Sequence, residues 1–257
     1  MHLFAPLIHR LASLGEWAYF QFLCLSAIPR IVSVPSLWLR PFHGTLTGAF
    51  PLAVVAGFAL GAVIWLHTRD VLARTGSGAV EYLPTFLGAA VLLELAPIAA
   101  GLILAARSGA SLGAELASMK LGEQLDALEL LGVSPMARLV APRTLACVLS
   151  APLLHILIAA LALGSGYLAE IATGSTSLLK YQAAVLRELR IADVLPAGLK
   201  TLVFGFVIGG TGCFVGLRAN GGSEGVGEAA TVGVVYCSLL VLLADVILVG
   251  IIHAALG

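Results

Sequence analysis

Charge is the scarcest property of this chain. Charged residues make up only 11% of its 257 residues, whereas a soluble domain carries about 25%. The 14 basic and 14 acidic residues cancel to a formal net charge of zero, so no basic excess favours nucleic acid as a partner. The four cysteines lie far apart, with no CxxC pair and no Cys/His cluster of metal-ligand spacing. These absences exclude a soluble domain and indicate neither a nucleic-acid partner nor a metal site.

The sequence also lacks the motifs of nucleotide hydrolysis and of hydrolytic catalysis. No GxxxxGK[ST] motif is present, and GLKT at residues 198–201 lacks its glycine spacing and its Gly-Lys pair. Ser165, His155 and Asp245 are conceivable catalytic groups, but Asp245 lies in a different apolar segment from the other two, and no GxSxG or HExxH pattern is present. We therefore expect no catalytic residue and no cofactor on this chain. Any ATP would bind to a partner.

Hydrophobic residues, in contrast, make up 60% of the chain, and the mean hydropathy is +1.03. Five apolar segments each approach the 20 or so residues that cross a bilayer as a helix. They predict an all-α, multi-pass membrane protein, because a β-barrel would show short alternating segments instead. The five segments are residues 46–67, 83–106, 145–168, 194–217 and 232–256.

The N-terminal segment is predicted to form a unit of its own. Residues 3–28 have apolar side chains at helical spacing, and Pro29 and Pro35 are expected to break the chain after them. We interpret residues 1–43 as an amphipathic helix and elbow on the membrane surface, and residues 44–257 as the transmembrane domain. The alternative is that the N-terminal helix is a true first span.

Three charged residues lie inside the apolar segments: Glu94, Lys200 and Asp245. An ionised side chain at bilayer depth costs at least about 2.5–3.5 kcal/mol, so it usually has a partner or a function. Each helical residue adds about 1.5 Å along the helix axis. If the second and fourth segments cross the membrane in the direction opposite to the fifth, the three charges lie at similar depths in the bilayer. They are therefore expected to meet near mid-membrane, either as a charge pair that holds the helices together or as a contact for a lipid headgroup.

Small residues recur four apart in the apolar segments, a spacing that lets helix backbones approach closely. Such helix packing is predicted at Gly57, Gly61, Gly205, Gly209, Gly212 and Gly216. The partner helices are expected either within this chain or in a second copy of it.

Residues 111–131 predict one amphipathic helix between two spans. Gly132 is its expected C-cap, and Pro135 prevents continuation. Basic residues number eight against six in favour of placing this segment and the N-terminus in the cytoplasm. The acidic polar face is poorly suited to an anionic leaflet and better suited to a basic groove on a protein partner.

Residues 92–143 resemble the signature region of the MlaE permeases, the membrane subunits of lipid-transporting ABC systems that work with MCE-domain proteins. The matching motifs include ELxP at residues 94–97, RSG at 107–109, MK at 119–120, EQ at 123–124 and PR at 142–143. Residues 223–248 are also similar to the family, including the acidic Asp245, and the resemblance covers most of residues 44–257. The chain departs from the family pattern at Ala96, where glycine is usual, and at Leu93, Glu228 and Gly233, where the loss of basic residues removes positive charge.

The resemblance implies a permease subunit that moves phospholipid, or a related lipid, between the bacterial inner membrane and an MCE-domain partner, with a role in outer-membrane lipid asymmetry. The expected partners are a second copy of the chain, a separate ABC ATPase, the MCE-domain protein and a STAS-domain protein. ATPase coupling is expected through the segment that holds Glu115, Lys120, Glu123, Gln124, Asp126 and Glu129. The alternative is an autonomous secondary transporter or channel that uses the intramembrane charges and needs no nucleotide.

Overall fold

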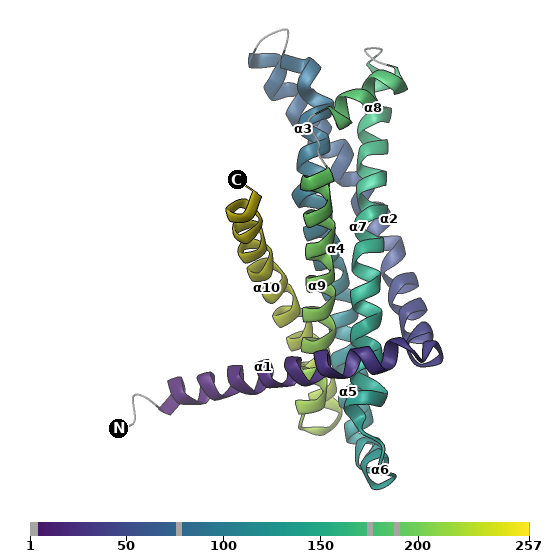
Figure 1. Ribbon diagram of the computed structural model, residues 1–257, viewed down its shortest axis with the longest axis vertical. Coiled ribbons are helices and arrows are strands. Elements are labelled where there is room, and N and C mark those ends of the chain that lie inside the picture. The colour runs from purple at the N-terminus through teal and green to yellow at the C-terminus, as the bar shows by residue number, and fades with distance from the viewer. Residues whose placement is uncertain (1–4, 76–78, 174–176, 188–190, 257) are drawn as a thin grey trace.

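The computed structural model describes residues 5–75, 79–173, 177–187 and 191–256, and these residues form helices with no strand among them (Figure 1). Five helical stretches are long and apolar enough to cross a membrane. The predicted all-α fold with five spans and an additional N-terminal helix is thus confirmed. The five stretches are Pro35–Arg74, Ala79–Leu121, Met136–Ala172, Asp193–Arg218 and Gly222–Ala255.

Helix α1 (Ala5–Val32) is the N-terminal helix, and it runs across the long helices near one end of the molecule (Figure 1). It is not among the five stretches, which agrees with a helix that lies on the membrane. The predicted break at Pro29 is wrong, because α1 continues to Val32 and α2 begins at Pro35. Pro29 stands in the last turn of α1, where its missing N–H removes only one backbone hydrogen bond.

Helix α7 (Ala141–Ala172) forms the centre of the bundle, with α2 (Pro35–Thr75) and α9 (Ile191–Arg218) packed along it. Helix α2 has 41 residues, about 60 Å at the usual rise, so it extends beyond a hydrocarbon core of about 30 Å. The boundary predicted between residues 43 and 44 lies inside this helix. The core of buried apolar side chains lies between these three helices and the second span.

The second span is helical from residue 79 to residue 121, with two π-helical turns inside it. Each π turn leaves one backbone carbonyl without its usual partner and widens the helix. Pro97 follows the first π turn closely and has no N–H to donate to the preceding turn. The elements are η1 (Ala79–Tyr82), α3 (Leu83–Ala90), η2 (Val91–Leu95), α4 (Ala96–Leu104), η3 (Ala105–Gly109) and α5 (Ala110–Leu121).

The single helix predicted for residues 111–131 is wrong in one respect, because the structure divides it into α5 and α6 (Gln124–Leu130). Glu123 separates the two helices with a left-handed backbone, φ 56°. The predicted C-cap is confirmed. Gly132 has φ 73°, its N–H donates to Glu129, and the next N–H donates to Leu128, as in a Schellman motif. A third π turn, η4 (Met136–Val140), then leads into α7.

Helix α10 (Gly222–Leu256) lies on the outside of the bundle and leans away from it towards its C-terminal end (Figure 1). It packs mainly against α5 and α9. At the end of the molecule opposite α6, the short helix α8 (Leu178–Leu186) packs against α3.

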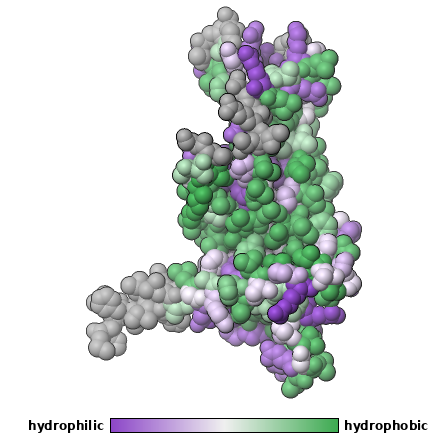
Figure 2. Space-filling view, viewed as in Figure 1, coloured by the Kyte–Doolittle hydropathy of each residue, from purple (hydrophilic) through white to green (hydrophobic). Residues whose placement is uncertain are grey.

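The surface shows where the bilayer lies. A broad hydrophobic zone covers the middle of the molecule, and hydrophilic residues gather towards both ends (Figure 2). Many of the exposed side chains on α2 and α10 are large and apolar, including Phe50, Phe58, Leu243 and Ile247. This is a multi-pass membrane protein, because only a lipid environment removes so much apolar surface from water.

Candidate functional site

The structure brings the three intramembrane charges together from three different helical elements. Lys200 Nζ of α9 lies 2.7 Å from Glu94 Oε2 of η2 and 2.9 Å from Asp245 Oδ1 of α10. The first contact is also a hydrogen bond donated by the ammonium group. The second is an ion pair whose geometry is not that of a hydrogen bond, and Asp245 Oδ1 has no hydrogen-bond partner among the described residues.

Burial differs strongly within this group of three charges, which we call the charge cluster. The Lys200 side chain is 1% exposed and that of Asp245 is 10% exposed, whereas that of Glu94 is 43% exposed. Two carboxylates share one ammonium, so the fully ionised cluster carries one negative charge in excess. Glu94 is therefore the member through which the cluster can meet a ligand.

A pocket of about 290 Å³ opens beside the charge cluster. Its walls come from the first π turn, the start of α9 and the end of α10, which are the three helical elements that hold the cluster. The lining combines apolar and ionisable side chains: Leu93, Glu94, Asp193, Ala197, Lys200, Val249, Ile252 and His253. A polar group bound here would lie next to Glu94 while an attached hydrocarbon chain remained in apolar surroundings.

His155 of α7 lies behind the cluster and is buried. It hydrogen-bonds to the backbone of Leu92 in the first π turn and is close enough to Lys200 for an electrostatic interaction. Its Nε2 has no partner in the part of the chain that the structure describes. The contact with a π turn, whose carbonyls are incompletely paired, favours a packing role for His155 over that of a catalytic base.

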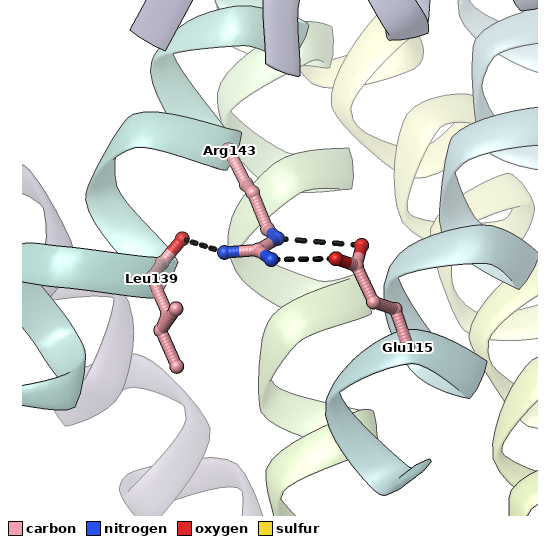
Figure 3. Close-up of polar contacts among 3 residues, drawn as sticks. All are labelled: Glu115, Leu139 and Arg143. Atoms are coloured by element: carbon pink, nitrogen blue, oxygen red, sulfur yellow. Dashed lines mark hydrogen bonds and ion pairs between the residues drawn. The ribbon is translucent and has the colours of Figure 1, made fainter. Parts of the chain in front are cut away.

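The second predicted site, the segment around α5 and α6, is anchored to the bundle by its own charges. Arg143 at the start of α7 donates two hydrogen bonds to the Glu115 carboxylate, at 2.6 and 3.4 Å, and a third to the Leu139 carbonyl (Figure 3). A guanidinium bound to both carboxylate oxygens fixes orientation as well as distance. Glu115 therefore joins α5 to α7 and does not extend freely towards a partner.

Lys120 has a similar anchoring position. Its Nζ donates to the Ala219 carbonyl at 2.9 Å and to Asn220 Oδ1 at 3.3 Å, both in the connection between α9 and α10. The other four residues predicted for coupling have exposed positions in or next to α6, at a distance from the charge cluster: Glu123, Gln124, Asp126 and Glu129.

The six glycines predicted for helix packing all face neighbouring helices of this chain. A Cβ at Gly61 would lie 1.9 Å from the Ala162 carbonyl oxygen, and one at Gly57 would lie 2.9 Å from that of Ile158, so these two pack α2 on α7. Gly205 and Gly209 similarly face α7, at Cys147 and Thr144, while Gly212 and Gly216 face α5, at Leu112 and Gly113. The glycines therefore allow close packing of α2 and α9 on α7, and of α9 on the second span.

Two polar contacts were not predicted from the sequence. Trp65 Nε1 of α2 donates to the buried Glu170 carboxylate of α7 at 2.6 Å. Close to it, Tyr181 of α8 donates to the Leu163 carbonyl, and burial together with the charge of Glu170 raises the pKa of Tyr181 to about 12. The available signal in the sequence was the carboxylate of Glu170 near the end of an apolar segment, which suggests a polar partner. The sequence does not show that this partner is Trp65.

A larger groove of about 870 Å³ runs between α1, the end of α9 and α10. Trp17 of α1 contributes to its wall and donates a hydrogen bond to Thr211 of α9. Arg218, also in the wall, forms an ion pair with Glu16 and lies 4.9 Å from the centre of the Phe214 ring. These contacts hold α1 against the bundle.

The bundle, the charge cluster and the anchored segment define a class: a helical membrane permease. The comparisons with known proteins agree. The family described as Permease MlaE matches residues 38–251. A probable ABC transporter permease protein of Rickettsia typhi is 33% identical over 91% of this chain and 89% of its own length.

Two further relatives extend the comparison. The intermembrane phospholipid transport system permease protein MlaE of Haemophilus influenzae is 30% identical over 95% of this chain and 93% of its own. The chloroplastic protein TRIGALACTOSYLDIACYLGLYCEROL 1 of Arabidopsis thaliana is 30% identical over 76% of this chain and 64% of its own. The chain belongs to the MlaE permease family, and it is a permease of an ABC system.

Proposed function

We propose that this chain moves phospholipid between the bacterial inner membrane and an MCE-domain partner, driven by a separate ABC ATPase. The observation that carries this proposal is the charge cluster at the wall of a pocket inside an otherwise apolar bundle. Intramembrane charges of this kind mark substrate pathways. The name of the Haemophilus relative, an intermembrane phospholipid transport permease, supports phospholipid as the substrate class.

In this proposal the pocket beside Glu94 receives the polar headgroup. A volume of about 290 Å³ is at the low end of the range for ligand pockets and is too small for a whole phospholipid. The acyl chains would therefore extend along apolar helix surfaces outside the pocket. Helix α10 leans away from the bundle towards its C-terminal end (Figure 1). Its apolar residues Val249 and Ile252 line the pocket and provide such a surface next to it.

A second copy of the chain is the proposed cover for this surface. Only 17% of the residues in the apolar stretch of α10 are buried, the lowest share among the five spans of the described chain. The larger groove beside α1 continues this apolar surface, since seven residues of α10 contribute to its wall. A homodimer that brings the two copies of α10 together would enclose the acyl chains. The exposed apolar residues of α10 include Val235, Tyr236, Leu239, Leu242, Leu243, Val246, Ile247 and Ile251.

Coupling to the ATPase is proposed at residues 122–131, which comprise α6 and the residues that flank it on both sides. This segment protrudes at the end of the bundle that is expected to be cytoplasmic (Figure 1). It combines exposed carboxylates with two strongly exposed leucines, Leu130 at 89% and Leu131 at 78%. An apolar anchor inside a polar rim is the usual composition of a protein interface. We propose that the leucines enter a cleft on the ATPase whose rim is basic.

The anchoring contacts provide a path from this segment to the pocket. Arg143 and Glu115 join α5 to α7, and Lys120 joins α5 to the connection between α9 and α10. A displacement of α6 by the ATPase would therefore act on α7, α9 and α10 together. Helices α9 and α10 hold Lys200 and Asp245, so the pocket would change shape as the ATPase opens and closes. The MCE-domain assembly would meet the opposite end of the bundle, near α3 and α8, and a STAS-domain protein would bind to the ATPase.

The first test is purification of the tagged chain from native membranes in mild detergent, with co-purifying chains identified by mass spectrometry. We expect a P-loop ATPase and an MCE-domain protein in the complex. An autonomous secondary transporter, for which the intramembrane charges are the argument, would be recovered alone and would act in an ion gradient without nucleotide. Recovery of the chain alone in several detergents would contradict the proposal.

The second test addresses coupling. Arg143→Met should leave the ATPase bound but lower lipid transfer per ATP hydrolysed, because α5 is no longer fixed to α7. The charge swap Glu115→Arg with Arg143→Glu should restore part of the ratio, since the pair can form again with opposite polarity. Arg138→Met is the matched control, because Arg138 precedes the same helix and has no ion pair with Glu115. Equal ratios in all variants would contradict this path of coupling.

A further inference from the structure

The charges at the pocket beside Glu94 carry information about the headgroup. Three carboxylates surround the site: Glu94 and Asp193 contribute to its lining, and Asp245 lies directly behind Lys200. The basic side chains in the described lining are those of Lys200 and His253. With both of its carboxylates ionised, the charge cluster alone presents one negative charge in excess beside the pocket.

Lys200 cannot offset this charge for a ligand. Its ammonium is held between Glu94 and Asp245, at 2.7 and 2.9 Å, and its side chain is 1% exposed. An anionic group that approached Lys200 would have to displace a carboxylate that is already in contact. Displacement would leave that carboxylate without its partner in apolar surroundings, which is unfavourable. The lysine therefore serves as an internal counter-ion and not as a phosphate ligand.

Glu94, in contrast to Lys200, remains accessible to a ligand. Its Oε2 accepts the hydrogen bond from Lys200, and the side chain is still 43% exposed. An ionised carboxylate accepts several hydrogen bonds, so the exposed part of Glu94 can take another donor. The chemical group that fits is a primary ammonium, which has three N–H donors and a positive charge. A trimethylammonium group has the charge but no donor, and a glycerol headgroup on a phosphate adds negative charge.

We propose that this pocket selects phospholipids with a primary ammonium headgroup, such as phosphatidylethanolamine, over anionic phospholipids such as phosphatidylglycerol. The inference rests on the proposed function, because it assumes that the pocket receives a lipid headgroup. Glu94 is the residue that determines the preference, and phosphatidylcholine ranks between the other two lipids.

The test uses the full-length chain, purified in detergent and mixed with equal amounts of three dioleoyl lipids with ethanolamine, choline and glycerol headgroups. Native mass spectrometry reports which lipid is bound. We expect the ethanolamine lipid to exceed the glycerol lipid by about three- to tenfold, as appropriate for one partly exposed charge contact. Glu94→Gln should bring the ratio close to one. Glu81→Gln, which changes an exposed carboxylate in η1, is the matched control and should leave the ratio unchanged.

Each outcome decides a separate point. Bound phospholipid with equal or greater occupancy by the glycerol lipid would overturn the headgroup preference and leave the proposed function intact. No phospholipid above the level on an unrelated membrane protein would contradict both. If Glu94→Gln does not fold, Asp193→Asn on the facing wall serves as the second variant and should also lower the ratio. Glycerophosphoethanolamine, which has the headgroup without acyl chains, should not displace the lipid at equal concentration, and displacement would overturn the assignment to a lipid.

Discussion

Replacing Lys200 by methionine isolates the energetic role of the charge cluster. Methionine has a similar length and no charge, so the change removes the counter-ion while it leaves little empty volume. Glu94 and Asp245 then face each other without a cation between them. Their oxygens each contact the same nitrogen, at 2.7 and 2.9 Å, so they are at most about 5.6 Å apart.

The magnitude follows from this distance. Two unit charges about 5.6 Å apart repel each other by about 3 kcal/mol at an effective dielectric constant of about 20. Removal of one partner from a buried pair typically costs about 3–5 kcal/mol. Because Glu94 is partly exposed, solvent screens part of the repulsion. We expect Lys200→Met to lower the free energy of unfolding by about 2–4 kcal/mol.

The assay is unfolding by sodium dodecyl sulfate in mixed micelles, followed by tryptophan fluorescence. Lys200→Met combined with Asp245→Asn should recover at least half of the loss, because a single carboxylate remains and it reaches solvent. Lys180→Met, which changes an exposed lysine of α8, is the control and should have little effect. If Lys200→Met is as stable as wild type, or if the double variant is less stable than the single one, the charge cluster does not hold the helices together.

Three further predictions concern packing, a buried hydrogen bond and thiol reactivity. Gly61→Val should abolish folded expression, because a Cβ at this position would overlap the backbone of α7. Gly164→Val should be tolerated, because a Cβ there meets nothing within 4 Å. Size-exclusion profiles of fluorescent fusions measure the folded expression of both variants. Trp65→Phe should lower the unfolding free energy by about 1–3 kcal/mol, and Trp38→Phe by less, since Nε1 of Trp38 has no partner among the described residues. Burial raises the pKa of the Cys24 thiol, so maleimide labelling, read by peptide mass spectrometry, should stay slow even at pH 9 until the protein is denatured. These expectations would be contradicted if both glycine variants were expressed equally, if both tryptophan variants lost equal unfolding free energy, or if the native protein were labelled rapidly.

The spans were predictable because their signal is local and strong. Continuous apolar segments of about 20 residues show where helices cross, and the same arithmetic brought Glu94, Lys200 and Asp245 to similar depths. The limits of the helices were less predictable. Pro29 stands inside α1 because a proline in the last turn breaks little, and Glu123 ends α5 through a left-handed backbone that its residue type does not favour.

The candidate site was predictable only as a set of residues that share a depth. Depth follows from counting along one helix, whereas the side of the helix on which a charge lies depends on tertiary packing. For this reason the sequence left open whether the three charges hold the helices together or contact a lipid headgroup. The Trp65–Glu170 and Arg143–Glu115 contacts join residues 105 and 28 positions apart, and no local pattern connects such distant partners.

We expect this permease to move lipid only as part of an ATP-driven complex. The most direct measurement is transfer of a fluorescent phospholipid in proteoliposomes that contain the chain, its co-purified ATPase and the MCE-domain protein. We expect transfer with ATP, none without the ATPase, and a large loss with Lys200→Met at equal protein content. Movement of lipid or ions by the chain alone in an ion gradient, with no effect of nucleotide, would contradict the account.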